Sequence, residues 1–286
     1  MVWIVFGCNM TPSSFSSFRF GFVFLIFLLT GCASGSPAVP YPAFIQADEL
    51  PDIFVAGLPG VRAKQFAGDR ETRRSSIRLL LPADWKGTTG ASPGKSVELF
   101  VVAGEITLGS IALKAGSYAY IPPGFTGSNI STPSGAIALY FLDDANSAAV
   151  IQTPLILDSD LVDWQPVSED PEDFGLSVKE LRLDPGSGAR TWLLRIDRGA
   201  TQGWHKSSAV EEGYLLSGNY RHSECVNGEV ATGDYAPGGY FQRPPGAVNG
   251  GPEAAAASSA IWFLRRMAKG TVESVAACIA ELPDNK

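Results

Sequence analysis

Short runs of hydrophobic residues, separated by turns rich in Gly and Pro, extend over most of the chain after residue 42. This pattern is typical of many short β-strands joined by tight turns. Near the C-terminus the apolar residues instead follow a helical spacing: Val272, Val275, Ala276, Ile279 and Leu282. The pattern therefore predicts an all-β fold and a short C-terminal helix, which Thr271 caps and Pro283 ends.

The same series of segments occurs twice along the chain. Four pairs of segments correspond, in the same order: residues 44–52 with 155–163, 60–85 with 175–200, 97–109 with 211–220, and 116–124 with 238–246. Each copy is far longer than the unit of a solenoid, so the repeat indicates two tandem domains. We place them at residues 43–150 and 151–270, with the helix and a tail at residues 271–286.

Composition supports this class and excludes one kind of partner. The chain has 31 Gly and 20 Pro among 286 residues, and it is 45% hydrophobic and 18% charged, which is typical of a globular protein. Its net charge is −7, and no basic run occurs. We therefore expect no nucleic-acid partner.

The N-terminus has the pattern of a targeting segment. Arg19 is its only charged residue, and the apolar run at residues 20–29 is too short to span a bilayer comfortably. The run ends in Leu-Thr-Gly-Cys32, which resembles the lipobox of bacterial lipoproteins. An ordinary secretory signal cut near Ala33 is the alternative.

The lipobox resemblance implies a signal peptide at residues 1–31, lipid on Cys32 and a Pro-rich tether at residues 32–42. Acyl chains on this cysteine would anchor the protein to a membrane. The expected location is extracytoplasmic, in the cell envelope, facing the periplasm if the organism is Gram-negative. No later segment is apolar enough to cross a membrane.

Both histidines of the chain lie between Gly203 and Pro252. Six residues of this stretch match two short motifs of the cupin superfamily in type and spacing. His205, Glu211 and Gly218 match the first motif, and Gly238, Pro244 and Gly246 match the second. The sequence resembles a double cupin (bicupin), of the poorly characterised ChrR-like and DUF4437-like kind, over nearly all of residues 43–270. The resemblance implies two tandem jelly-roll β-barrels of the RmlC-like type.

The departures from the motifs concern the metal ligands. Ser207 and Asn249 stand where cupins have histidines. In the first copy the matching positions hold Ser92, Gly94 and Gly127, and we match Glu98 to Glu211. We therefore expect no metal in the first barrel and a degenerate metal motif in the second.

Three interpretations of the second barrel remain open. His222 could join His205 and Glu211 to hold a divalent transition metal, because imidazole and carboxylate suit such ions. Alternatively, His205 and Glu211 could hydrogen-bond each other without a metal. Thirdly, the barrel could bind a small anionic or sugar-like molecule through His205, Glu211, Tyr240, Arg243 and Asn249.

The function we favour from sequence is small-molecule binding, or a vestigial module. The rival is a metal-dependent cupin enzyme of the dioxygenase, isomerase or hydrolase type, with His205 and Glu211 as ligands. A structural or partner-binding surface protein is a third possibility. Cys225 and Cys278 could form a disulfide that joins a long loop to the C-terminal helix.

Overall fold

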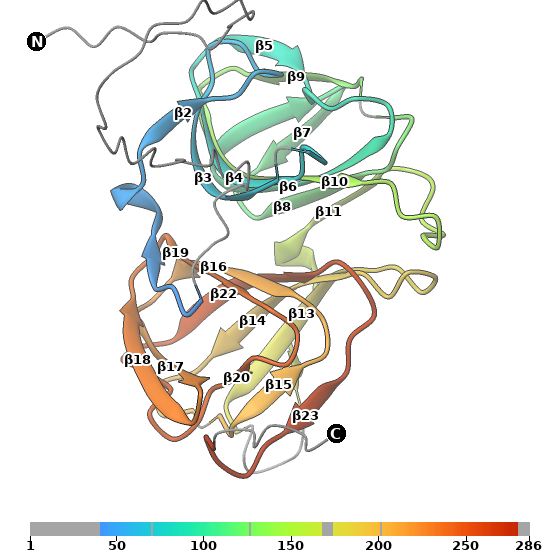
Figure 1. Cartoon of the computed structure of the whole chain (residues 1–286). Coiled ribbons are helices and arrows are strands. Elements are labelled where there is room, and N and C mark those ends of the chain that lie inside the picture. Colours follow the sequence, from blue (N-terminus) through green and yellow to red (C-terminus); the bar gives the residue numbers. More distant parts are fainter. Residues whose placement is uncertain (1–40, 70, 126, 168–173, 201, 280–286) are drawn as a thin grey trace, which may run out of the picture. The chain divides into compact units, whose positions relative to one another are not determined.

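A computed structural model of the chain describes residues 41–69, 71–125, 127–167, 174–200 and 202–279 (Figure 1). The expected signal peptide, the lipidation site Cys32 and all of the tether except its last two residues lie outside the described residues. In the described part, no helix is long and apolar enough to cross a membrane. All described residues belong to one compact unit, residues 35–286.

The first barrel is built from antiparallel strands. They are β2 (Asp52–Phe54), β3 (Arg62–Gly68), β4 (Ser75–Leu81), β5 (Trp85–Thr88), β6 (Lys95–Leu108), β7 (Ile111–Lys114), β8 (Ser117–Ile121), β9 (Asn129–Thr132), β10 (Ala136–Asp144) and β11 (Leu155–Asp158). Along the main sheet the order is β11-β8-β6-β10-β4-β3-β2, while β5 and β7 pair with β9 and β6. The long strand β6 takes part in both layers and so closes the barrel.

The second barrel repeats this plan with two sheets. Its strands are β1 (Ile45–Gln46), β12 (Gln165–Pro166), β13 (Leu176–Leu183), β14 (Arg190–Ile196), β15 (His205–Ser207), β16 (Glu211–Ser217), β17 (Tyr220–Val226), β18 (Glu229–Tyr235), β19 (Gly239–Arg243), β20 (Val248–Asn249), β21 (Ala255–Ala256), β22 (Ala260–Arg266) and β23 (Val272–Ser274). One sheet has the order β1-β19-β16-β22-β14-β13-β12 and the other β18-β17-β20-β15-β23. The predicted all-β fold with two tandem barrels is confirmed.

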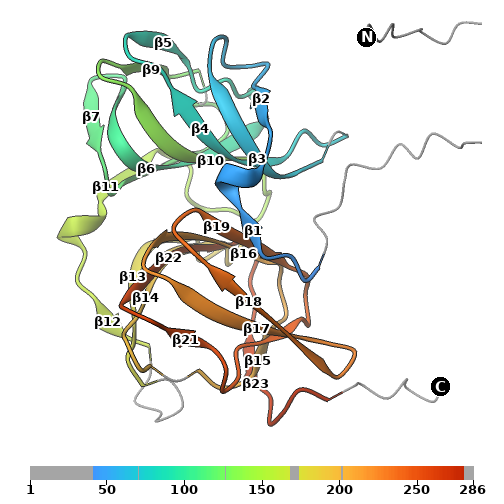
Figure 2. The ribbon, with the colours of Figure 1, turned by 90° about the vertical axis from the view of Figure 1, so that its left-hand side faces the viewer.

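Each barrel borrows a strand from the other half of the chain. β1 pairs with β19 of the second barrel, and β11 pairs with β8 of the first (Figures 1 and 2). Each strand is followed by one 3-10 turn: η1 (Ala47–Glu49) follows β1, and η2 (Ser159–Leu161) follows β11. The two segments therefore correspond, as the repeat predicts. The boundary predicted near residue 150 does not separate the strands of the two barrels, because β1 and β11 each belong to the barrel of the other half.

The predicted C-terminal helix is wrong. Residues 272–274 form strand β23, which pairs with β15 in the register His205↔Ser274. Val272 and Ile279, the side chains expected to pack against the barrel, are 58% and 70% exposed. Pairing with a sheet edge satisfies the backbone groups of this segment, whereas a short helix would bury too little apolar surface to be stable alone. Cys225 and Cys278 do form a disulfide.

A third apolar cluster lies between the two barrels, separate from their interiors. Phe66 stacks on Tyr240 with 4.5 Å between the ring centroids, and Phe141 stacks on Phe263 at 5.5 Å. Beside these rings runs a buried ionic network. Arg265 of β22 donates to Glu98 at 3.1 Å and to Glu212 at 2.8 Å. Aromatic packing and ionic contacts thus join the two barrels.

Candidate functional site

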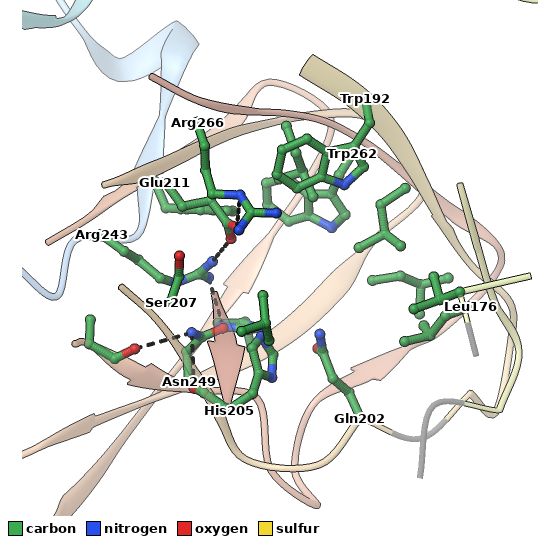
Figure 3. A pocket seen from close by; sticks show the side chains of 18 of the residues that line it. Leu176, Trp192, Gln202, His205, Ser207, Glu211, Arg243, Asn249, Trp262 and Arg266 are labelled. Carbon is green, nitrogen blue, oxygen red and sulfur yellow. Dashed lines mark hydrogen bonds and ion pairs between the residues drawn. The ribbon is translucent and has the colours of Figure 1, made fainter. Parts of the chain in front are cut away.

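The second barrel encloses a cavity of about 280 Å³ (Figure 3). One wall is apolar and aromatic and comes mainly from β13, β14 and β22: Leu176, Val178, Leu194, Ile196, Trp192 and Trp262. A second, polar wall is formed by side chains from β16, β19 and β22 of the same sheet and from β15 and β20 of the other sheet: His205, Glu211, Arg243, Asn249 and Arg266. A cavity with one wall of each kind suits a small amphipathic molecule.

Four of the five predicted ligand-binding residues line this cavity: His205, Glu211, Arg243 and Asn249. The fifth, Tyr240, does not. Its ring stacks on Phe66 between the barrels, and its hydroxyl donates to Glu212 at 2.6 Å. Successive side chains on a strand point to opposite faces, so Phe241 and Arg243 face the cavity while Tyr240 faces away. The assignment of Tyr240 to the site is therefore corrected.

Arg243 is the centre of the polar wall and is almost fully occupied by partners. Its Nε donates to Glu224 Oε1 at 2.7 Å, and its Nη1 donates to Glu211 Oε1 at 3.4 Å. Its Nη2 lies 2.7 Å from His222 Nε2, and its guanidinium covers the ring of Phe241 at 3.5 Å. Two carboxylates and one imidazole thus hold this buried cation in place.

Glu224 is a site residue that sequence reasoning missed. It is 2% exposed, and besides Arg243 it accepts a hydrogen bond of 2.9 Å from the hydroxyl of Tyr41. Burial raises the pKa of this carboxyl, but the charge of Arg243 lowers it more, and the pKa falls to about 2. A signal was present, because Glu224 lies two residues after His222 on one strand and so shares its face.

His222 is neutral and accepts a hydrogen bond from Arg243. Burial and the nearby charge of Arg243 lower its pKa to about 4. A guanidinium can only donate, so His222 Nε2 must accept from Arg243 and the proton must sit on Nδ1. The lone pair of this imidazole therefore points at a cation of the protein and cannot bind a metal.

His205 and Glu211 do not form the predicted pair. His205 Nδ1 lies 3.1 Å from the carbonyl oxygen of Gly203, to which it donates, and this leaves Nε2 as an acceptor. Glu211 instead faces two guanidiniums, with Arg266 Nε 3.9 Å from its Oε2. Asn249 directs its amide nitrogen to the carbonyl oxygens of His205 and Ala247, both at 3.4 Å.

The donor set does not fit a metal ion. In the part of the chain that the structure describes, no three His, Cys, Asp or Glu side chains are grouped so that they could hold one. The predicted set of His205, Glu211 and His222 therefore does not form a ligand cluster. The guanidinium of Arg243 contacts both Glu211 and His222, and a cation at that place repels another.

The match of Glu98 to Glu211 is also corrected. Glu98 pairs with Tyr120 of β8, and the equivalent residue in β16 is Glu212, which pairs with Gln242 of β19. Both carboxylates point into the contact between the barrels. The position of Glu211 is taken in the first barrel by Val97, which is fully buried in that barrel's apolar core.

Solved structures of several other proteins have the same fold. A candidate dioxygenase from Nostoc punctiforme superposes with a TM-score of 0.63 and 19% identity, covering 85% of this chain and 87% of its own. Protein Ylba from E. coli gives a TM-score of 0.61, 15% identity and coverage of 78% and 90%. A variant of the Bacillus subtilis oxalate decarboxylase superposes with a TM-score of 0.56 and 13% identity, covering 82% of this chain and 79% of its own. At such identities the likeness shows the fold alone.

A family model gives the closer relationship. The domain of unknown function DUF4437 matches residues 57–272, which is most of both barrels. No functionally curated protein matches the sequence. The chain therefore belongs to the DUF4437 family, and its two jelly-roll barrels have the fold of these solved structures.

Proposed function

We propose that the second barrel binds a small amphipathic carboxylate and that the protein acts as a binding module. The cavity supports this proposal because its two walls differ in chemistry. In Figure 3, Arg266, Glu211 and Arg243 lie on one side and Leu176 on the other. A molecule with an anionic end and an apolar body would match both walls.

The observation that carries the proposal is a set of unpaired polar atoms around the cavity. In the described part of the chain, four buried side-chain atoms that belong to cavity-lining residues make no hydrogen bond: Arg266 Nε, Trp262 Nε1, His222 Nδ1 and Asn249 Oδ1. Buried polar groups in folded proteins are almost always paired. Three of these atoms are donors, so the residues that line the cavity carry more unpaired donors than acceptors, which favours a ligand rich in acceptor oxygens.

Arg266 is the residue that we expect to hold the carboxylate. Unlike Arg243, it has no carboxylate closer than Glu211 Oε2 at 3.9 Å among the described residues; it also donates to the carbonyl oxygen of Gly270 at 3.4 Å and lies over the ring of Trp192 at 5.0 Å. Burial lowers its pKa despite the charge of Glu211. A buried guanidinium without a close counter-ion is costly, so a ligand carboxylate would gain by neutralising it.

The enzymatic alternative is less well supported by the residues present. Metal-dependent chemistry needs several nitrogen or carboxylate ligands that converge on one point. Arg243 engages both His222 and Glu211, the two side chains that would have to supply such ligands with His205. Binding without catalysis therefore explains the observed pairing better.

The membrane anchor is a separate part of the proposal, supported by the sequence of residues 1–42 alone. Lipid on Cys32 would hold the protein at an extracytoplasmic membrane surface. The cavity would then capture its ligand outside the cytoplasm.

The test compares small carboxylates with their neutral amides. A panel that includes 3-phenylpropionate and 3-phenylpropanamide is titrated into chelator-dialysed protein by calorimetry. We expect at least one carboxylate to bind, and its amide to bind roughly ten- to a hundredfold more weakly, since a charge-assisted hydrogen bond is lost.

The matched variants are Arg266→Gln and Arg62→Gln. Arg62 forms an exposed ion pair with Asp52 at 3.0 Å on the first barrel, so its loss should leave binding unchanged. Arg266→Gln should bring carboxylate affinity close to that of the amide. Failure of every carboxylate to bind, or equal binding of both members of each pair, would contradict the proposal.

A further inference from the structure

The cavity opens to solvent beside the C-terminal segment. Four residues both line the cavity and are exposed: Val167, Pro244, Val272 and Ser274. Two of them belong to β23, and Val167 follows β12 directly. Since β12 and β23 are the end strands of the two sheets, the mouth lies between these edges.

We call residues 271–279 the C-terminal strap. Its strand β23 pairs with β15, the strand that carries His205, and the two lie side by side in Figure 2. Beyond the strand, Val275 N donates to Trp204 O at 2.7 Å. At its base, Thr271 N donates to the Ser208 hydroxyl at 2.9 Å. The strap thus forms one edge of the mouth.

Apolar burial contributes little to holding the strap. Val272 and Ile279 are mostly exposed, and Glu273 of the strap forms an ion pair with Lys206 of β15 at 3.7 Å, in which Glu273 is largely exposed. A short strand at a sheet edge, held by backbone bonds in contact with water, is only marginally stable. The Cys225–Cys278 disulfide is therefore the strongest tie between the strap and the barrel.

We propose that this disulfide controls access to the cavity. With the bond intact, the strap stays on β15 and narrows the mouth. With the bond broken, the strap leaves β15 and the cavity opens. The proposal rests on the proposed function in one respect, namely that the cavity is a ligand site.

The chemistry of the switch is thiol–disulfide exchange with a dithiol. The dithiol supplies two electrons and two protons, the Cys225–Cys278 bond becomes two thiols, and the dithiol becomes a disulfide. Both cysteines are partly exposed, so a reductant can reach them. Arg266 Nη1 donates to the carbonyl oxygen of Gly270, which directly precedes the strap. Release of the strap from β15 would therefore also disturb a contact of the guanidinium that we expect to bind the ligand.

The test measures entry into the cavity without any ligand. Ser207 lies on β15, is 9% exposed and lines the cavity, so Ser207→Cys places a thiol inside it. Its alkylation by iodoacetamide is followed by mass spectrometry in two proteins: one with the disulfide intact, and one with Cys225→Ser and Cys278→Ser. We expect alkylation to be roughly tenfold faster or more without the disulfide, because labelling of a buried thiol follows the open population.

The matched control is Ser177→Cys. Ser177 is 7% exposed and lies in the same barrel but does not line the cavity. Its alkylation should not change when the disulfide is removed. Reduction of the Ser177→Cys and Ser207→Cys proteins with a dithiol should reproduce both results.

Two outcomes would overturn the proposal. An unchanged rate at the introduced Ser207→Cys thiol would mean that the strap does not limit access. An equal acceleration at both introduced thiols would mean that the disulfide stabilises the whole barrel instead of its mouth. Neither outcome depends on carboxylate binding, so failure of the proposed function would be recognised separately.

Discussion

Glu98 of the first barrel accepts a hydrogen bond of 2.8 Å from Arg182 of the second. The same carboxylate also accepts from Tyr118 at 2.7 Å and from Arg265 at 3.1 Å, and it is 2% exposed. A buried carboxylate with this many donors is fully paired, and each donor depends on it. We conclude that Glu98 is the central residue of the ionic contact between the barrels.

Glu98→Gln should destabilise the protein strongly. Removal of the negative charge leaves the buried guanidinium of Arg182 without its direct counter-ion, and breaking a buried ion pair in this way costs about 3–5 kcal/mol. Urea unfolding at pH 7 measures the change. Asp52→Asn removes an exposed ion pair of Arg62 and Lys64 and serves as the control, which should change the midpoint far less. Similar effects of both substitutions would contradict the assignment.

The same variant predicts a difference in acid stability. Burial raises the pKa of Glu98, but Arg182 and Arg265 lower it further, to about 2, from an ordinary value of 4.5. The folded pKa lies below the unfolded one, so the stabilisation is complete above pH 4.5 and is lost as the pH falls towards 2. Unfolding free energies in this window should fall less steeply for Glu98→Gln than for the natural sequence.

His222 should give a separate pH dependence at higher pH. Its pKa falls from 6.5 to about 4 on folding, because burial and Arg243 disfavour the charged form. The unfolded chain therefore binds more protons between these values, and stability should decrease as the pH falls from 6.5 to 4, by on the order of 3 kcal/mol in total. His222→Gln should remove most of this slope, and His205→Gln should retain it. Parallel pH profiles for the natural sequence and His222→Gln would contradict the buried, neutral imidazole.

The exchanged strands predict that neither half folds alone. Residues 151–279 lack β1, so the edge of β19 would stay unpaired, and β11 would have no partner. The aromatic faces that meet between the barrels would also become exposed. We expect residues 151–279 to show no cooperative thermal transition, whereas co-expression with residues 41–150 should restore one. A cooperative transition of the isolated fragment would show that strand exchange is dispensable.

Lipidation predicts the behaviour of one substitution outside the described residues. Cys32→Ser should prevent acylation and release the protein from the membrane fraction of the expressing bacterium. Mass spectrometry of the digested natural protein should show a mass increase on the peptide that begins at Cys32. Cys8→Ser, which changes a cysteine upstream of the lipobox, is the control and should leave the membrane association unchanged. Loss of association in both variants would argue against a lipobox.

The sequence by itself determined the two barrels and four residues of the cavity's polar wall. The internal repeat and the turn-rich short strands are local features, and His205, Glu211, Arg243 and Asn249 do line one cavity. The two errors on β6 and β19 have a common cause. A shift of one residue turns a side chain to the other face of a strand, so Glu98 and Tyr240 were assigned to a barrel interior although both point between the barrels.

Only the tertiary structure decided which partners these residues meet. Sequence shows that residues 44–52 and 155–163 correspond, but their pairing with the opposite barrel depends on where distant strands leave an open edge. Likewise, Glu224 and Tyr41 are 183 positions apart, and their hydrogen bond exists because the chain start crosses to the second barrel. Arg243 and Glu224 come together because β17 and β19 belong to opposite sheets that face each other across the cavity. Such contacts depend on packing between sheets, for which a linear pattern carries no distance information.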